Sequence, residues 1–279
     1  MMSMPPDQHA KRIQEAFSSQ APTFEDPRLN QAFTSGLEPL VAAIDPGKDE
    51  LCLDVAAGTG HVSRALAPHV RAIVALDAVE DMLVQGMEQA RTSGLGNIVF
   101  QRGEALALPY LDDTFDLVVT RLSLHHLSDP QRAVAEMVRV CRPGGRVVLA
   151  DLVRDPEAPP PDELERIRDP SHLRVLTGDE ISAALEMAGA AIVASDIEVR
   201  ERPLEPWLEQ SRTPAAAAAQ VRERLRQELA GGAPTGLRPI LREDVLHFVQ
   251  LWATVTALCN GGSNRSGALS ASTPRKESA

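Results

Sequence analysis

The sequence predicts an α/β fold in which a mostly parallel sheet is covered by helices on both faces. Between residues 51 and 151, short apolar runs alternate with segments of helical periodicity. Each apolar run is bounded by Gly, Pro or Asp, as strands commonly are. Regular alternation of this kind is typical of strand–helix–strand units, which place their helices over a parallel sheet.

Five strands and three helices are predicted in this part of the chain. The strands are Leu51–Val55, Ile73–Leu76, Ile98–Gln101, Phe115–Thr120 and Arg146–Asp151. The helices are His61–Ala67, Val79–Thr92 and Gln131–Cys141. Pro143, Gly144 and Gly145 follow the third helix, and glycine readily takes the left-handed conformation that ends a helix before a strand.

The pattern changes after Asp151. Residues 156–161 form a proline-rich connection, and Thr177–Glu180 has the composition of a helix start. A strand near Ile192–Arg200 and a final strand-like segment, Val245–Leu258, flank two predicted helices within residues 204–230. These helices have charged faces and few residues for a core of their own, so we expect them to form a lid.

Composition excludes several classes of function. The net charge is −11 and no stretch is densely basic, which argues against a nucleic-acid partner. Cys52, Cys141 and Cys259 show no metal-ligand spacing, so we expect no metal and a reducing, cytoplasmic environment. No stretch approaches the roughly 18 apolar residues of a membrane span. Aromatic residues make up only 3% of the chain, too few for an obvious aromatic cage or base-stacking platform.

A glycine-containing turn follows the first predicted strand, in the segment LCLDVAAGTG at residues 51–60. Glycine is needed where a ligand approaches the backbone too closely for a β-carbon, although a tight turn without a ligand would look similar. Asp77 ends the second strand, where a carboxylate can accept hydrogen bonds from ribose hydroxyls, and Glu104 follows the third. Ligands of open α/β sheets bind at the carboxyl ends of the strands, so these groups predict one nucleotide-binding crevice.

Two cofactors that contain adenosine are candidates for this crevice, NAD and S-adenosylmethionine. A dinucleotide fingerprint requires Gly-x-Gly-x-x-Gly, whereas this chain has Gly58-x-Gly60-x-x-Ser63. Asp54 lies just before the turn, where its charge suits the ammonium group of a methionine moiety better than a diphosphate. The residues therefore favour S-adenosylmethionine.

The chain resembles the class I S-adenosylmethionine-dependent methyltransferases of the ubiquinone/menaquinone-biosynthesis type, which carry the type 11 methyltransferase domain. The matching segments, between residues 51 and 153, are DVAAGTGHVS, ALDAVEDML, GEALALPYLDDTFDLVVTRLSLHHL and EMVRVCRPGGRVVLAD. The family pattern is acidic-x-Gly-x-Gly-x-Gly, and Ala56 replaces its first glycine, as in many relatives. The resemblance implies a Rossmann-like, seven-stranded, mostly parallel sheet with an antiparallel last strand and a helical lid insertion before it.

The same resemblance implies a domain organisation and a set of cofactor contacts. A single domain at 9–260 would contain an N-terminal cap at 9–45, a cofactor-binding core at 48–153 and the lid at 204–230, between disordered residues 1–8 and 261–279. A segment around Phe17–Phe24 would close over the cofactor. The implied contacts are Ala56, Gly58, Thr59 and Gly60 to the methionine part, Asp77 to the ribose, Met82, Glu104 and Ala105 to the adenine, and Arg121 on the sulfonium side.

Histidines are the candidates for action on the acceptor. Methyl transfer depends mainly on alignment of the nucleophile, the methyl group and sulfur, and a base helps only when the nucleophile must lose a proton. His125 and His126 follow the fourth strand, and His172 lies in Arg168–His172, which resembles a segment of one bacterial subgroup. We expect one of the adjacent pair to be structural. His125 is the candidate base, and His125 and His172 are candidate acceptor ligands.

The acceptor itself is left open by the sequence. The Asn/Asp-Pro-Pro-aromatic turn of nucleobase methyltransferases is absent after the fourth strand, and the separated cysteines argue against an arsenite acceptor. A small molecule, quinone-like or a secondary metabolite, methylated on O, N or C, is therefore expected. The sparse aromatic residues favour an aliphatic or polar acceptor. A protein of this fold that binds the cofactor but catalyses another step, such as cyclisation, is the alternative, and the oligomeric state stays open.

Overall fold

An eight-stranded sheet has the order β3-β2-β1-β4-β5-β8-β6, with the short strand β7 paired to β8. The computed structural model describes residues 6–29, 34 and 36–260. Strands β1 to β5 are parallel, while β8 is antiparallel to β5, β6 and β7. The strands are β1 (Leu51–Val55), β2 (Ala72–Asp77), β3 (Ile98–Arg102), β4 (Phe115–Arg121), β5 (Cys141–Val153), β6 (Ala190–Pro203), β7 (Pro239–Arg242) and β8 (Val245–Cys259).

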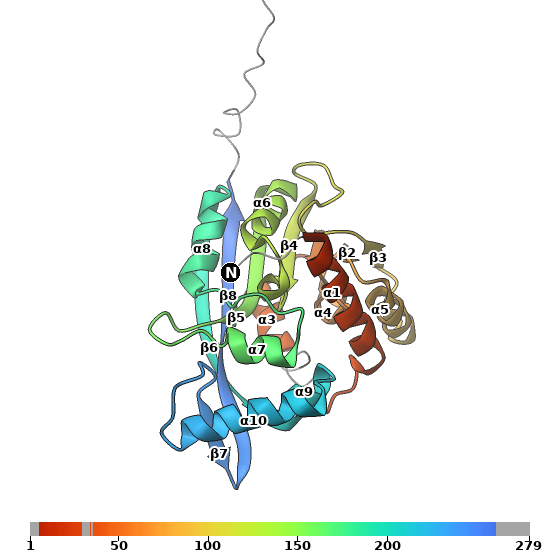
Figure 1. Cartoon of the computed structure of the whole chain (residues 1–279). Coiled ribbons are helices and arrows are strands. Elements are labelled where there is room, and N and C mark those ends of the chain that lie inside the picture. The colour runs from red at the N-terminus through yellow and green to blue at the C-terminus, as the bar shows by residue number, and fades with distance from the viewer. Residues whose placement is uncertain (1–5, 30–33, 35, 261–279) are drawn as a thin grey trace, which may run out of the picture.

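Helices cover both faces of the sheet and one end of it (Figure 1). The helices are α1 (Pro6–Gln20), α3 (Leu37–Ile44), α4 (His61–Leu66), α5 (Glu80–Thr92), α6 (Pro130–Val140), α7 (Asp162–Arg168), α8 (Gly178–Met187), α9 (Leu204–Gln210) and α10 (Ala215–Leu229). Three short 3₁₀ turns are η1 (Ala21–Thr23), η2 (Ala67–His69) and η3 (Leu124–His126). The predicted α/β class, its parallel strands and its antiparallel last strand are confirmed, and β7 is one short strand more than the seven predicted.

The alternation of side chains along β1 explains how the sheet holds two cores. Leu53 and Val55 face a cluster formed with α6 and α8, whereas Cys52 faces a second cluster formed with α3 and α4. Successive side chains of a strand point to opposite faces, so a strand covered on both sides is apolar at every such position. This is why the parallel strands appear as continuous apolar runs in the sequence.

Local signals place the helix ends close to their predicted positions, with one exception. Thr177 and Glu180 form a reciprocal capping box at the start of α8, as the sequence indicates. Helix α6 ends at Val140, because Cys141 is already extended and pairs with Phe115. Residues 143–145 therefore form an irregularity inside β5, with Gly144 at φ 75°, and do not cap the helix as predicted.

Helices α9 and α10 have a core of their own, contrary to the prediction for residues 204–230. They pack with α7 and with the lower ends of β6 and β8, beyond the carboxyl ends of the parallel strands (Figure 1). The buried residues of this cluster are Leu164, Leu204, Trp207, Leu208, Ala218, Val221, Leu225, Leu237 and Phe248. The prediction from the sequence missed this core because its apolar residues come from five separate segments, which are α7, α9, α10, the loop at Leu237 and β8. We call this unit the acceptor subdomain.

The N-terminal region divides into two parts with different positions. Helix α1 and η1 pack onto α5 through Phe24, Met82 and neighbouring apolar residues, over the sheet edge. Helix α3 is part of the sheet's own core through Leu40 and Ile44. Helix α1 begins at Pro6, inside the segment 1–8 for which disorder is predicted, while residues 1–5 and 261–279 lie outside the described residues.

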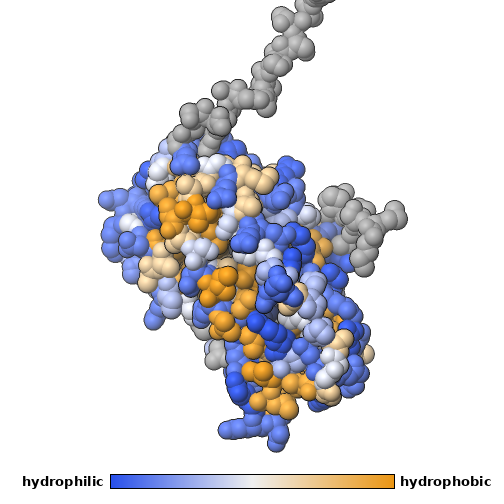
Figure 2. Space-filling view, turned by 90° about the vertical axis from the view of Figure 1, so that its left-hand side faces the viewer, coloured by the Kyte–Doolittle hydropathy of each residue, from blue (hydrophilic) through white to orange (hydrophobic). Residues whose placement is uncertain are grey.

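One edge of the sheet is open. Strand β6 is the last in the order, and its exposed apolar residues include Val193, Ile197 and Val199. Figure 2 shows apolar surface on this side of the molecule. Among the described residues, no helix is long and apolar enough to cross a membrane.

Candidate active site

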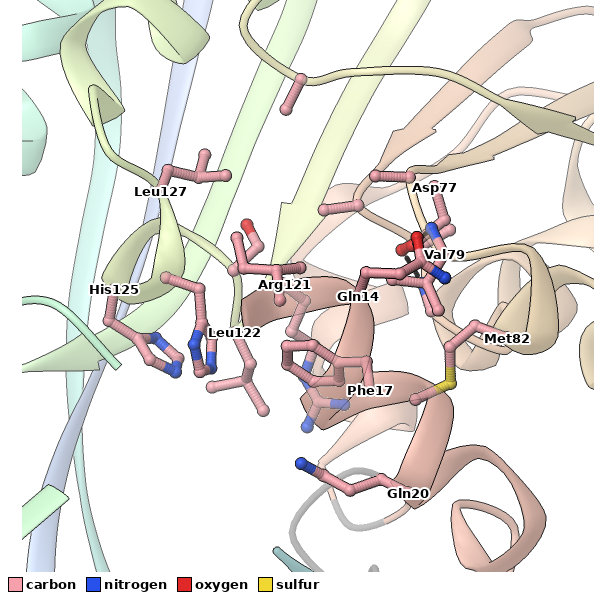
Figure 3. Close-up of a pocket in the computed structure, with 18 of the residues that line it drawn as sticks. Gln14, Phe17, Gln20, Asp77, Val79, Met82, Arg121, Leu122, His125 and Leu127 are labelled. Carbon is pink, nitrogen blue, oxygen red and sulfur yellow. Dashed lines mark hydrogen bonds between the residues drawn. The ribbon is translucent and has the colours of Figure 1, made fainter. Parts of the chain in front are cut away.

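A cavity of about 670 Å³ lies at the carboxyl ends of β1, β2, β4 and β5, between the sheet, α1 and the acceptor subdomain. This volume is in the range of small-molecule sites. Asp77, Val79 and Met82 lie on one side of it and His125 and Leu127 on the other, with Phe17 and Arg121 between them (Figure 3). We call the two sides the cofactor half and the acceptor half.

The turn after β1 brings bare backbone to the cofactor half. Ala56, Gly58 and Gly60 have left-handed φ values of 55°, 57° and 77°. A β-carbon at Gly60 would lie 3.0 Å from the Phe100 ring, so this position is restricted by both conformation and space. Ala56 and Gly58 line the cavity, whereas Thr59 and Gly60 lie buried behind its wall and do not reach it.

Asp54 fastens the turn to the helix that follows. Its Oδ2 accepts hydrogen bonds from Ser63 N at 3.0 Å and from Ser63 Oγ at 2.6 Å. Burial raises the pKa of Asp54 to about 7. A cationic group placed in the cavity beside Asp54 would stabilise the carboxylate, which agrees with the predicted preference for an ammonium group.

Asp77 is held at the end of β2 with its carboxylate facing the cavity. Oδ2 accepts from Gly58 N at 2.7 Å and Oδ1 accepts from Val79 N at 2.8 Å. Burial raises the pKa of Asp77, and main-chain bonds from Val79, Gly58 and Ala78 to the carboxylate oppose that rise. A carboxylate has about four acceptor positions, so these bonds hold the group in place without using its whole capacity to accept from a ligand.

The far end of the cofactor half is apolar on two sides. Met82 on α5 is buried in a cluster with Phe24, and Ala105 after β3 is a second buried residue of the cavity wall. Glu104 is exposed and lines the same end. An apolar slot with a carboxylate at its rim suits a flat heterocycle that carries hydrogen-bond donors.

Arg121 extends from the end of β4 into the centre of the cavity. Its guanidinium lies 5.5 Å from the centroid of the Trp252 ring, and Arg200 lies 4.2 Å from the same ring. Burial, together with the charge of Arg200, lowers the pKa of Arg121 to about 10. Its predicted place on the sulfonium side of the cofactor stays a prediction.

His125 and Asp151 form a buried pair on the acceptor side. His125 Nδ1 lies 2.5 Å from Asp151 Oδ1, and Asp151 also accepts main-chain bonds from Ser123, Leu124 and Leu152. Burial lowers the pKa of His125, but the Asp151 carboxylate raises it by more, so the net shift is upward. His125 Nε2 has no hydrogen-bond partner among the described residues, and the ring lines the cavity.

The other two histidines surround this pair in bracing positions. Ser171 Oγ lies 3.1 Å from His126 Nδ1, and burial and the charge of His125 lower the pKa of His126. His172 is 1% exposed and its Nε2 bonds Asp162 Oδ1 at 2.8 Å. The His172 ring lies 5.7 Å from that of His125 but is not among the cavity-lining residues. The structure thus gives His172 no position for the predicted contact with the acceptor.

Several residues of the acceptor half escaped the sequence-based prediction. Asp151 has the same signal as Asp77, a carboxylate at the end of a parallel strand, and that signal was available. Trp207, Arg202 and Trp252 line the cavity from α9, β6 and β8. Both tryptophans of the chain line the cavity here, and the expectation of an aliphatic or polar acceptor stays a prediction.

Comparison with known proteins identifies the family. A model described as a methyltransferase domain matches residues 53–149. The uncharacterized methyltransferase YcgJ of Bacillus subtilis is 32% identical over 213 residues, which are 74% of this chain and 82% of that protein. The chain belongs to this family of S-adenosylmethionine-dependent methyltransferases. The crystal structure of YcgJ superposes with a TM-score of 0.72 and 25% identity, covering 81% of this chain and 99% of that one.

A second relative confirms the predicted resemblance. The ubiquinone/menaquinone biosynthesis C-methyltransferase UbiE of Roseobacter denitrificans is 32% identical over 165 residues, which are 55% of this chain and 64% of that protein. The fold is also shared by the [4+2]-cyclase SpnF, with a TM-score of 0.58, 20% identity and coverage of 81% of this chain and 80% of that one. The turn at 56–58, the paired bonds of Asp77 and the slot at Met82 fit the family's cofactor.

Proposed function

We propose that this protein transfers a methyl group to a small molecule bound in the acceptor half, with His125 as the general base. The observation that carries the proposal is the Asp151–His125 pair, whose free Nε2 faces the cavity opposite the cofactor half. When bound, S-adenosylmethionine supplies a methyl group already activated by a positively charged sulfur. The protein then needs to align the acceptor and, for an acidic acceptor, remove its proton.

In this proposal the cofactor half holds the donor through groups that the fold places beforehand. Ala56 and Gly58 present backbone to the methionine part, Asp77 accepts from the ribose hydroxyls, and Met82 packs on the adenine. Glu104 and Ala105 lie at the adenine edge, and Arg121 lies along the sulfonium side. Asp54 orients the turn through Ser63 and adds negative charge near the ammonium group.

The proton follows a short path on the acceptor side. Asp151 keeps the proton of His125 on Nδ1, so Nε2 has the lone pair that a base needs. The acceptor's proton moves to Nε2 as its nucleophile attacks, and the buried carboxylate then stabilises the imidazolium. Asp151 is therefore a positioning residue and His125 the catalytic one. A hydroxyl or an acidic C–H acceptor suits a base of this kind better than a neutral amine does.

Methyl-labelled S-adenosylmethionine, incubated with the protein and a small-molecule extract, tests this function. We expect labelled product and S-adenosylhomocysteine in equal amounts, and loss of both for His125→Gln while calorimetry still detects S-adenosylhomocysteine binding. Conversion of extract components without any S-adenosylhomocysteine would support the alternative, cyclisation or another step on the same fold. If His125→Gln forms product at the wild-type rate, His125 does not act as the general base.

A further inference from the structure

The acceptor half contains an arginine whose hydrogen-bond partners are all neutral. Arg202 lies near the end of β6 and lines the cavity. Its Nη1 donates to Gln250 Oε1 at 3.1 Å, and its Nη2 donates to Gln210 Oε1 at 3.4 Å. A guanidinium has five N–H groups, and these two bonds leave most of them available.

Two neighbouring arginines, Arg168 and Arg200, differ from Arg202 because each forms an ion pair with a carboxylate. Arg168 pairs with Glu165 at 3.1 Å and Arg200 pairs with Glu198 at 2.7 Å, whereas Arg202 forms no ion pair with any described residue. Glu165 also accepts from Gln250 Nε2 at 3.2 Å, so this carboxylate is already engaged twice. Burial, together with the charge of Arg168, lowers the pKa of Arg202 to about 9, although the Glu165 carboxylate opposes this shift. The side chain remains a cation at neutral pH, in a place where an unpaired charge is costly.

The tryptophans beside Arg202 exclude a cationic acceptor. Arg121 and Arg200 lie over the Trp252 ring, and Arg168 lies 4.4 Å from the Trp207 centroid. The ring faces that would otherwise attract an ammonium group therefore already hold cations. Leu122, Leu152 and Trp252 belong to one apolar cluster and form an apolar part of the cavity wall. The acceptor half thus combines an apolar wall with a buried arginine that lies over the Phe248 ring and has no ion pair of its own among the described residues.

We propose that the acceptor is a small organic carboxylate, which binds Arg202 through its carboxylate while its nucleophilic atom lies beside His125. The proposal rests on the proposed function and names the substrate class for the same cavity. A guanidinium with no ion pair of its own matches one negative charge, and the guanidinium fork matches the two oxygens of a carboxylate. Binding would give Arg202 an ion pair, so a charge that is costly to bury would contribute to specificity.

Hexanoate and hexanamide are suitable probes because they share a shape and differ in charge. Both tryptophans of the chain line the cavity, so tryptophan fluorescence reports directly on its occupancy. We expect hexanoate to bind about ten- to a hundredfold more tightly than hexanamide, as a charge-assisted bond predicts. Arg202→Met should bring this ratio close to one, and Arg202→Lys should keep part of it. Arg222→Met, which removes a partly buried arginine of α10 that is paired with Glu205 and does not line the cavity, should leave the ratio unchanged.

Two outcomes would overturn the proposal. Equal affinities of the wild-type protein for the two probes would show that the cavity does not select the charge, and this comparison depends on no variant. A retained preference in folded Arg202→Met would place the recognition elsewhere. The titrations are made with and without S-adenosylhomocysteine, whose own binding is measured by calorimetry. Failure of that binding would reject the proposed function, whereas failure of the carboxylate preference would reject only the acceptor class.

Discussion

The cofactor half and the acceptor half of the cavity come from different parts of the chain. The cofactor half is built almost entirely from turns between residues 54 and 105, each directly after a parallel strand. The acceptor half combines His125 with side chains from α7, α9, β6 and β8, far apart in sequence. Local motifs therefore describe the first half well and the second half poorly. Sequence similarity between relatives therefore predicts a shared ligand for the cofactor half, but it does not predict a shared ligand for the acceptor half.

The largest effect is expected at His125, because a change there should affect methyl transfer to the acceptor and leave cofactor binding intact. His125→Gln should lower methyl transfer about 10²- to 10⁴-fold, the usual contribution of a positioned base, with little change in S-adenosylhomocysteine affinity. Rates are measured by S-adenosylhomocysteine release with an acceptor that the wild-type protein uses. His69→Gln is the matched control, because His69 is exposed on η2. A parallel loss of cofactor affinity would mean that the two halves are not independent.

The next effect concerns the stability of the acceptor subdomain. Leu225→Ala removes a fully buried side chain from its core and should lower the free energy of unfolding by about 2–5 kcal/mol. Leu229→Ala, at a 40% exposed position of the same helix, should change it by less than about 0.5 kcal/mol. Denaturant unfolding followed by tryptophan fluorescence gives both values. If both variants lower the free energy of unfolding by the same small amount, the result would support the earlier expectation of a loosely packed lid.

On the cofactor side, Asp77→Ala should weaken binding of S-adenosylhomocysteine. The loss of a charged acceptor for two hydroxyls corresponds to about 1.5–3 kcal/mol, or roughly ten- to a hundredfold in affinity. Asp81→Ala, an exposed carboxylate in the first turn of α5, is the control and should bind nearly as well as the wild-type protein. Calorimetry measures both, and unchanged binding by folded Asp77→Ala would refute the ribose role.

The smallest effect is a contrast in titration between the adjacent histidines. The pKa of His125 should lie above its ordinary value of 6.5 and that of His126 below it. Methyl transfer should then rise as the pH increases through the pKa of His125, since a base must be deprotonated to act. Asp151→Asn removes the charge that raises this pKa, so the inflection should move to lower pH.

Imidazole NMR signals report these values without any acceptor. Glu186→Gln, a change at an exposed residue of α8, is the control and should leave both titrations in place. The comparison of Asp151→Asn with this control separates a specific charge effect from a general change in net charge. A His125 signal that titrates below that of His126 would contradict the assignment of the base.

Most of the fold could be predicted because its signals are local. Strand β1 coincides with its prediction and the other parallel strands agree except at their ends, since continuous apolar runs bounded by turn residues leave few alternatives. The start of α8 at Thr177 was visible from the capping residues alone. The end of α6 was not, because Cys141 leaves the helix to pair with Phe115, a partner that sequence proximity does not reveal.

The sequence by itself determined the sheet, the turn at residues 56–60, the carboxylate at Asp77 and the class of cofactor. Each depends on neighbours within a few residues, or on the rule that ligands meet the carboxyl ends of parallel strands. Only the tertiary structure decided that His125 pairs with Asp151, that His172 lies behind the wall, and that Arg202 reaches the cavity without a carboxylate. Burial, pKa and pairing depend on distances between segments far apart in the chain, and those distances exist only after the strands, α7 and α9 have packed.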